Sequence, residues 1–149
     1  MSAEIEAPPE HVWRVTSDPR NLPHWGKYID GAVVPAGGLA SGVRYTVVMR
    51  FMSVRASIEA KVLEWEPPWR SKVRLHGVLD ATVTTTIASL PFDRSMLRHE
   101  VSYSFRGTLG RFGARSLAAV GGAKLALRRG LLAQKREIEH AERTYHRRG

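Results

Sequence analysis

Apolar and polar residues alternate with a period of two through the middle of the chain, which is typical of β-strands with one buried face. In residues 43–51 the odd positions are apolar or aromatic, and Arg44, Thr46 and Arg50 lie between them. Residues 54–63 repeat the pattern, with aliphatic side chains on one face and charged or hydroxyl side chains on the other. Both segments are therefore predicted to be strands with an apolar inner face.

Three further segments carry strand patterns, at residues 71–77, 81–90 and 96–105. Prolines and other turn residues interrupt the pattern at 66–68 and 91–94, so short turns are expected there. Consecutive strands joined by short turns form an antiparallel meander. The alternation directs four polar side chains inward among the apolar ones, namely Tyr45, Thr85, His99 and Tyr103.

Helical signals precede this run of strands. Residues 1–7 predict a short strand, and the Pro-Pro-Glu run at 8–10 then opens a helix, because proline suits a first helical turn and an acidic residue suits its positive end. A second short turn is expected over residues 19–22, with Asp18 as its cap. Residues 23–25 (Pro-His-Trp) are expected to end that turn.

After Gly107 the apolar period changes to three and four, which predicts one long amphipathic helix packed on one side. Glycines at positions 110, 113, 121, 122 and 130 crowd its first half. Glycine costs about 1 kcal/mol per helical site relative to alanine, so we expect the regular part of the helix to begin near Ala123. The stripe that faces the rest of the protein comprises Val120, Ala123, Leu127, Leu131, Gln134, Ile138, Ala141 and Tyr145.

The order of these elements predicts an α+β fold. A sheet with one apolar face has to cover that face, and the C-terminal helix is the only predicted element long enough to do so. We therefore expect a single domain over residues 1–149, in which a curved antiparallel sheet wraps around the long C-terminal helix and two short helices follow the first strand. A strongly twisted sheet that closes on one helix is expected to leave a wedge-shaped gap at one end.

The formal net charge of +9 is unevenly distributed. Residues 108–149 hold ten lysines and arginines against three acidic residues, so the excess lies in the C-terminal segment. This distribution fits either a solvated helix face or a surface that docks on RNA, the ribosome or an anionic membrane. The chain has no cysteine, which excludes disulfides and thiolate chemistry. Without a signal-peptide pattern or an apolar run of membrane length, we expect a cytoplasmic protein.

Three motifs together resemble the SRPBCC superfamily, which includes START and Bet v 1 domains. They are residues 5–13 followed by 17–25, the sequence VLEWEPPWR at 62–70, and residues 131–139 in the closing helix. The chain is most similar to the branch of polyketide cyclases/dehydrases and coenzyme-Q-binding-like proteins. The resemblance implies a helix-grip fold with a deep cavity between the sheet and the C-terminal helix. It does not select a function, because this superfamily includes carriers as well as enzymes.

A cavity of this kind would be lined by the inward side chains of the sheet. Met49, Phe51 and Phe105 would form a soft apolar wall, and the resemblance implies that Trp25 lies at the cavity mouth. The candidate ligand-binding residues are Trp25, Tyr45, Val47, Met49, Phe51, Ile58, Thr85, His99, Tyr103, Phe105 and Leu127.

The inward polar residues are also the candidates for catalysis. His99 is either a core histidine that is hydrogen-bonded to its neighbours or an acid–base group in the cavity, since imidazole changes charge near neutral pH. Tyr45 and Tyr103 are able to donate hydrogen bonds to a ligand carbonyl, although buried tyrosines often find a partner within the protein. The candidate catalytic residues are therefore His99, Tyr45 and Tyr103.

Three functional hypotheses follow. The first is binding or transport of an apolar small molecule, such as a lipid, a quinone or a polyketide-like aromatic compound. The second is a polyketide aromatase/cyclase-like enzyme that uses His99 with one of the tyrosines. The third is an interaction protein whose basic C-terminal helix contacts RNA, the ribosome or an anionic membrane.

Binding without catalysis is favoured among these hypotheses. The resemblance implies that cyclases of this fold use an arginine deep in the pocket. The arginines of the predicted strands instead point outward, and they are Arg44, Arg50, Arg55 and Arg74. No cofactor and no metal site are expected, because the histidines show no paired ligand spacing.

Overall fold

The structure is a computed structural model that describes residues 1–51, 53–77, 80–104 and 113–148. Within these ranges, seven strands form one antiparallel sheet in the order β1-β7-β6-β5-β4-β3-β2. The elements in chain order are β1 (Ser2–Ile5), α1 (Pro9–Thr16), the 3-10 turn η1 (Pro19–Asn21), α2 (Leu22–Trp25), β2 (Ile29–Val33), β3 (Arg44–Phe51), β4 (Val54–Glu66), β5 (Arg70–His76), β6 (Asp80–Leu90), β7 (Arg94–Ser104) and α3 (Gly113–Arg148).

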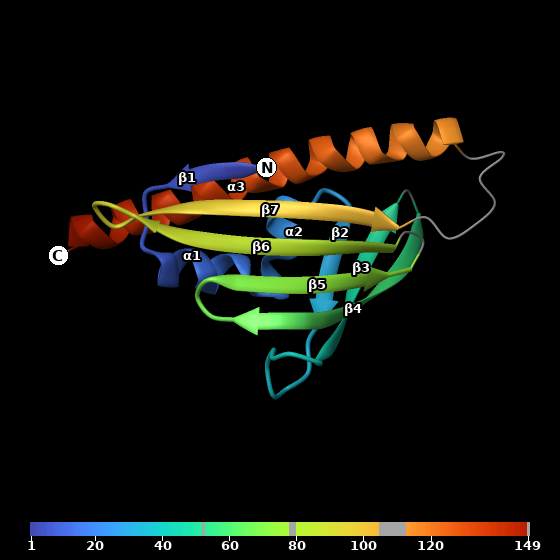
Figure 1. Ribbon diagram of the computed structural model, residues 1–149, viewed down its shortest axis with the longest axis horizontal. Coiled ribbons are helices and arrows are strands. Elements are labelled where there is room, and N and C mark those ends of the chain that lie inside the picture. The colour runs from blue at the N-terminus through green and yellow to red at the C-terminus, as the bar shows by residue number, and fades with distance from the viewer. Residues whose placement is uncertain (52, 78–79, 105–112, 149) are drawn as a thin grey trace.

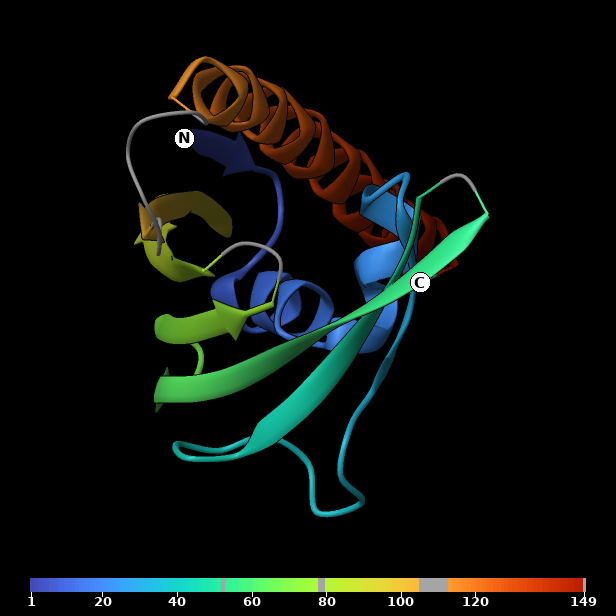
Figure 2. The same cartoon turned by 90° about the vertical axis from the view of Figure 1, so that its right-hand side faces the viewer.

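The sheet curves so strongly that both of its edges approach the helical layer (Figure 1). Figure 2 shows the strands winding from β1 round to β2, with α3 across the open side and α1 and α2 inside the curve. α3 packs beside the edge strand β1, while α2 contacts both α3 and the opposite edge strand β2. Both edges are therefore covered, which protects them from pairing with another chain. This arrangement confirms the predicted α+β helix-grip architecture.

Strand pairing confirms the faces that the alternation predicted. Val47 lies opposite Ile58 and Thr85 lies opposite His99, and residues paired in this way share a face of the sheet. The inward set therefore continues from β3 across to β7. β2 was not predicted as a separate strand, because a register shift between Ile29 and Gly31 interrupts its alternation.

The two short helical elements after α1 differ in part from the prediction. The Asp18 carboxylate accepts a hydrogen bond from the Arg20 backbone N–H at 3.0 Å, which confirms Asp18 as a cap. Residues 23–25 do not end the turn, because they belong to a separate helix, α2. Pro23 lies in the first turn of α2, where a helix does not need the N–H that proline lacks.

The expectation that α3 becomes regular only near Ala123 was wrong, because the helix begins at Gly113 and includes the glycines at 121 and 122. Glycine lowers helix stability without preventing the helical backbone. No helix in the described ranges is apolar over a stretch long enough to cross a membrane.

The predicted packing stripe of α3 holds over its middle turns and fails at its end. Leu131, Gln134 and Ile138 are buried, as the period predicted. Ala141 is exposed and Tyr145 is 77% exposed. Figure 1 shows the C-terminal end of α3 extending past the tips of the strands, so no element covers these last turns.

A continuous apolar core lies where β1, α1, the paired ends of β6 and β7, and the middle turns of α3 meet. Truncating one of its large aliphatic side chains would cost about 2–5 kcal/mol, because the cavity left behind cannot fully collapse. Its members are Ile5, Ala7, Val12, Ile87, Leu97, Leu131 and Ile138.

Polar contacts join α3 to the sheet beside this core. The His99 ring lies between Gln134 Oε1 at Nε2 (3.0 Å) and Thr85 Oγ1 at Nδ1 (2.9 Å). With Nε2 donating to the amide oxygen, Nδ1 accepts from the threonine hydroxyl, and both ring nitrogens of a neutral imidazole are satisfied. Burial lowers the pKa of His99, against the opposing effect of the Gln134 hydrogen bond, so the ring is held neutral.

The three glutamates of α3 each reach a different element. Glu139 accepts the Glu6 backbone N–H at 3.0 Å. Glu137 accepts the Trp25 indole N–H at 2.8 Å, and Glu142 lies 2.6 Å from His11 Nδ1 on α1. Burial opposes the ionised form of Glu139, but hydrogen bonds from the Glu6 N–H and the Lys135 ammonium outweigh it and lower the pKa of Glu139. These carboxylates fix the position of α3 over the sheet.

The neutral, buried state of His99 predicts a specific pH dependence. Because its folded pKa is lower than the ordinary value of 6.5, the unfolded chain takes up a proton below this pH that the folded chain does not. The contribution of His99 to stability is thus present above pH 6.5 and decreases by up to about 1.4 kcal/mol per pH unit below it. We expect the stability lost in His99→Gln, measured by urea unfolding, to be larger at pH 7.5 than at pH 5. An equal or larger loss at pH 5 would show that the native ring carries a proton.

Gly130 lies in α3 where α2 approaches, and its replacement tests how closely these helices pack. A Cβ added there would lie 3.5 Å from the Trp25 carbonyl oxygen and 3.8 Å from Trp25 Cβ, which are ordinary contact distances. Gly130→Ala should therefore raise the free energy of unfolding by roughly 0.5–1 kcal/mol through its higher helix propensity. The matched control Gly42→Ala should lower it, because Gly42 has a φ of +87°. A destabilised Gly130→Ala protein would mean that the two helices lie closer together than the structure has them.

Candidate functional site

The inner face of the sheet is fully packed at one end and open to water farther along. Beyond the apolar core, the inward side chains of the central strands differ in exposure. Val47, Ala60, Val62 and Ala81 are buried. Five larger aliphatic side chains are only half-buried, namely Ile58, Val73, Leu75, Val83 and Val101. Side chains in a filled interior are normally sealed from water by their neighbours. The half-buried inward residues are therefore partly accessible to water, and we call the stretch of the inner face that they form the hollow. α3 crosses the same side of the sheet (Figures 1 and 2).

Tyr45 is the polar group of this hollow with the clearest capacity to bind a ligand. It lies on the inner face of β3, opposite Ala60, and burial raises its pKa to about 12. Its hydroxyl has no hydrogen-bond partner among the residues that the structure describes, and no fully buried polar side-chain atom in those residues lacks a partner. The hydroxyl is therefore at a water-accessible surface, where it is free to donate to a bound molecule.

Three of the apolar residues predicted to bind the ligand lie together beside Tyr45. Val47 is buried against its neighbours in the sheet, and its partner Ile58 is half-buried. Met49 is half-buried one step farther along β3, opposite Ala56. The structure thus brings these residues onto one continuous apolar surface, as the alternation predicted.

His99 and Thr85 lie on the same face but are occupied by each other. Only 7% of the His99 surface is exposed, and its two ring nitrogens bind Thr85 and Gln134. This geometry corresponds to the core-histidine alternative rather than to an acid–base group presented to a ligand. The sequence did not reveal Gln134 as the partner, because helix periodicity placed it only on the packed stripe.

Trp25 also has its polar edge engaged within the protein. The indole N–H donates to Glu137 of α3, and the side chain remains half-buried between α2 and α3. Its ring face is therefore the part that remains available for an apolar contact. This bond ties α2 to α3 at the side of the fold where α2 covers the edge strand β2.

Four of the predicted ligand-binding residues are not described at the level of their side chains. Phe105 lies outside the described residues, and so do the side chains of Phe51, Tyr103 and Leu127, whose backbones belong to β3, β7 and α3.

The strand arginines lie on the outer face, as the alternation predicted. Arg44 and Arg50 are exposed and form ion pairs with Glu59 at 2.8 Å and Asp30 at 3.0 Å. Arg55 and Arg74 are exposed on the same face. None of these four guanidinium groups is directed into the hollow.

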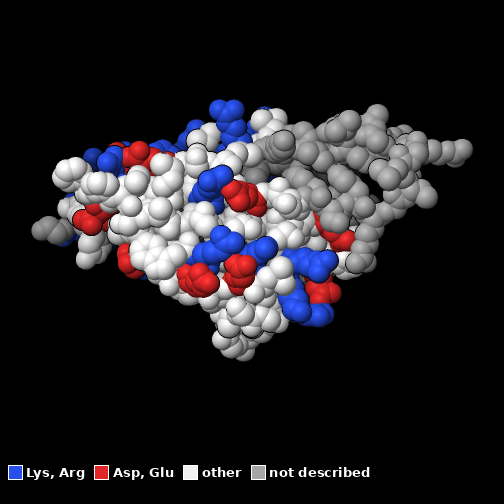
Figure 3. All heavy atoms as spheres, in the orientation of Figure 1, with Lys and Arg blue, Asp and Glu red and all other residues white. Residues whose placement is uncertain are grey.

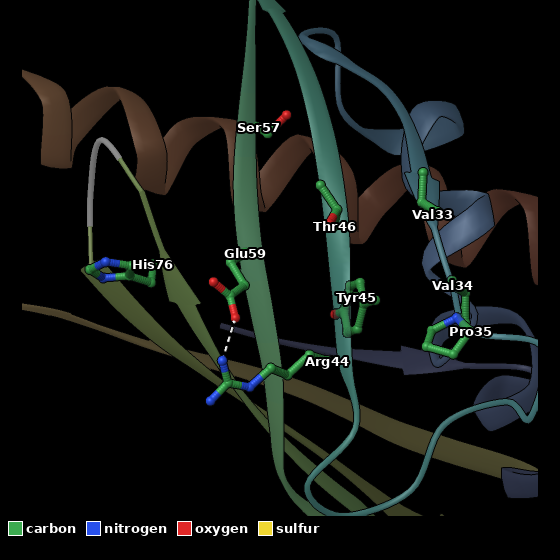
Figure 4. A pocket seen from close by; sticks show the side chains of 9 residues that line it. All are labelled: Val33, Val34, Pro35, Arg44, Tyr45, Thr46, Ser57, Glu59 and His76. Atoms are coloured by element: carbon green, nitrogen blue, oxygen red, sulfur yellow. Dashed lines mark hydrogen bonds and ion pairs between the residues drawn. The ribbon is translucent and has the colours of Figure 1, made fainter.

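An open groove of about 590 Å³ lies on the outer face, and the sequence did not predict it. Figure 4 shows side chains of β3, β4 and β5 together with the end of β2, and the Arg44–Glu59 pair crosses the groove. Tyr45 also borders the groove, because β3 is paired with β2 only as far as Thr46. The lining residues are Val33, Val34, Pro35, Arg44, Tyr45, Thr46, Ser57, Glu59 and His76. Because Arg44 and Glu59 neutralise each other, this groove offers hydroxyl groups and one imidazole rather than a net charge.

Sequence comparison identifies the family. Residues 1–139 match the family described as "Polyketide cyclase / dehydrase and lipid transport". No curated protein sequence matches the chain.

Solved structures share the fold at low sequence identity. A conserved protein from Geobacillus kaustophilus is 20% identical with a TM-score of 0.68, and the alignment covers 94% of this chain and 93% of that one. A START superfamily protein from Mycobacterium smegmatis is 16% identical with a TM-score of 0.68, over 93% and 96% of the two chains. The di-domain ARO/CYC StfQ from the steffimycin biosynthetic pathway is 16% identical with a TM-score of 0.72, over 96% of this chain and 45% of that one.

The shared helix-grip architecture agrees with the SRPBCC resemblance of the three sequence motifs. Together with the family match over residues 1–139, it leads to one conclusion. The chain belongs to the family described as "Polyketide cyclase / dehydrase and lipid transport".

Proposed function

We propose that this protein binds a neutral, largely apolar small molecule in the hollow between the sheet and α3, with the Tyr45 hydroxyl as its polar anchor. The observation that supports the proposal most directly is the Tyr45 hydroxyl, which has no hydrogen-bond partner in the described residues although its residue lies on the inner face of β3. Binding sites for small molecules are typically apolar, with a few polar groups that orient the ligand.

The chemistry of the wall selects the class of ligand. The inward positions of β3 to β7 with described side chains carry no lysine, arginine, aspartate or glutamate. A charged group would lose its hydration there without gaining a partner, so the ligand is neutral where it is enclosed. A quinone, a neutral lipid or a polyketide-like aromatic compound with a carbonyl oxygen satisfies both conditions, because its carbonyl accepts from Tyr45.

The polar side chains in and around the hollow favour binding or transport of the ligand over catalysis. General acid–base catalysis works best with a pKa near the working pH, whereas the pKa of Tyr45 is raised to about 12. The His99 nitrogens are engaged by Thr85 and Gln134, and the four strand arginines lie outside the hollow. The di-domain ARO/CYC StfQ shares this fold, so a cyclase-like reaction in the same hollow is the second candidate function.

Filling the hollow tests whether binding occurs there. Val83 is half-buried on the inner face, and Val83→Phe should reduce the affinity for the neutral dye Nile red by at least about tenfold, because the ring occupies ligand space. Its free energy of unfolding should change by less than about 1 kcal/mol, since the new side chain enters a space that is not filled. The measurements are a fluorescence titration and urea unfolding.

The matched control is Val12→Phe, which adds the same atoms within the sealed core. It should lower the free energy of unfolding by about 1–3 kcal/mol through overpacking. Equal destabilisation by both substitutions would mean that the interior near Val83 is filled, and the binding proposal would then fail.

The anchor is tested with Tyr45→Phe, which removes one hydroxyl. We expect the affinity for a carbonyl-bearing probe such as menadione to fall about 2- to 10-fold, as for the loss of one hydrogen bond. Affinity for an aromatic hydrocarbon such as naphthalene should be unchanged. The control Tyr145→Phe alters a tyrosine that is 77% exposed and should leave both affinities as they are. A parallel loss for both probes would contradict the role of the hydroxyl.

A further inference from the structure

The outward face of α3 carries an arginine- and leucine-rich stripe that no other described element covers. Its members follow one another at helical spacing, and we call them the outward stripe: Leu125, Arg128, Arg129, Leu132 and Arg136. All five are exposed, with Leu125 at 51% and Leu132 at 41%. Seven residues separate the two leucines, so they lie two turns apart on the same face.

The arginines of this stripe differ from those of the sheet in having no acidic partner. Most sheet arginines are paired, as in Arg44–Glu59, Arg50–Asp30 and Arg70–Glu64. Arg128, Arg129 and Arg136 form no ion pair with any residue that the structure describes. This difference in ion pairing follows from where the arginines lie, because the stripe and the sheet face different sides of the molecule.

The three glutamates of α3 form no ion pair with the arginines of the stripe, because each is directed at another part of the fold. Glu137 binds the Trp25 indole, Glu139 binds the Glu6 backbone and Glu142 contacts His11. Figure 3 shows basic side chains along the upper edge, with acidic atoms among them toward its left end, and basic and acidic side chains next to each other over the sheet. The outward stripe therefore presents three arginines that have no acidic partner among the described residues.

We propose that the outward stripe docks on an anionic lipid surface. Arginines beside a negatively charged bilayer gain electrostatic attraction, and exposed leucines between them gain burial in the interfacial region. A helix that lies in the plane of such a surface needs both features on the same face, and the outward stripe has both. A phosphate backbone of RNA would use the arginines but would leave both leucines exposed to water.

The docking is separate from ligand binding, because the stripe faces away from the sheet that lines the hollow. It brings the cover of the hollow next to a lipid phase in which apolar molecules dissolve. The two proposals are tested with different probes, small molecules for ligand binding and vesicles for docking. A negative result for one therefore does not contradict the other.

The test is co-sedimentation of the full chain with sucrose-loaded vesicles at low salt. We expect binding to vesicles of equal parts phosphatidylglycerol and phosphatidylcholine, and no binding to pure phosphatidylcholine. The triple variant Arg128→Gln, Arg129→Gln and Arg136→Gln should lower the partition coefficient by about a hundredfold. The double variant Leu125→Ser and Leu132→Ser should lower it by about tenfold or more.

A matched triple variant separates the stripe from the net charge of the protein. Arg14→Gln, Lys61→Gln and Arg74→Gln remove the same charge from exposed residues on α1 and the outer sheet face. This control should change the partition coefficient by no more than about twofold, since these residues lie outside the docking face. Circular dichroism and thermal unfolding confirm that each variant is folded before it is compared.

Three results would overturn the proposal. They are absence of binding to the anionic vesicles, equal losses in the two triple variants, or full binding by the leucine variant. The last result together with tight binding of single-stranded RNA would assign the face to a nucleic acid instead. The proposal would be supported if only the stripe variants lose vesicle binding and if binding of the unaltered protein to the vesicles weakens as salt is raised.

Discussion

The position of α3 over the curved sheet is the constraint on which the rest of the structure depends. An apolar sheet face needs a cover, and this helix supplies it through a cluster of contacts over residues 131–142. Leu131 and Ile138 enter the apolar core, while Gln134, Glu137, Glu139 and Glu142 each bind a different part of the fold. The bond between Gln134 and His99 is buried and is therefore costly to leave unpaired, so it specifies the register of the helix on the sheet, with the less buried glutamate contacts in support.

This fixed segment divides the inner face of the sheet into two regions with different roles. Next to it the side chains are sealed from water, and the region provides the cohesion of the domain. Farther along, the aliphatic side chains of β5, β6 and β7 remain half-buried, and the Tyr45 hydroxyl has no partner in the described residues. Aliphatic side chains that stay partly accessible to water contribute less to stability than buried ones, and the sealed region offsets this loss. The same helix thus connects the stable end of the domain to the cover of the hollow.

Charged side chains are arranged differently on α3 and on the sheet. The glutamates of α3 contact α1, α2 and the backbone directly after β1, whereas the arginines of the outward stripe have no acidic partner in the described residues. The sheet, in contrast, pairs most of its arginines with neighbouring carboxylates. The net charge of +9 is therefore unevenly distributed, and three of its arginines gather on one face of α3. Two exposed leucines on that face give it an apolar component as well.

Much of the fold was accessible from local patterns, because alternation and helical periodicity depend only on near neighbours in the chain. They predicted the strand faces, the outward arginines, the Asp18 cap and the existence of the terminal helix. Local reasoning was less reliable where two effects compete. Proline at 23 suggested an end and instead opens α2, and glycines at 121 and 122 suggested a break that the helix does not have. β2 was missed because a register shift disturbs its period.

The sequence by itself determined which side chains share a face, since that follows from the geometry of a strand or a helix. Only the tertiary structure decided which of these side chains have partners. His99 and Tyr45 are equivalent in the alternation, yet Gln134 reaches His99 from α3, whereas no described residue reaches the Tyr45 hydroxyl. That difference depends on contacts between residues far apart in the chain, and periodicity carries no information about them.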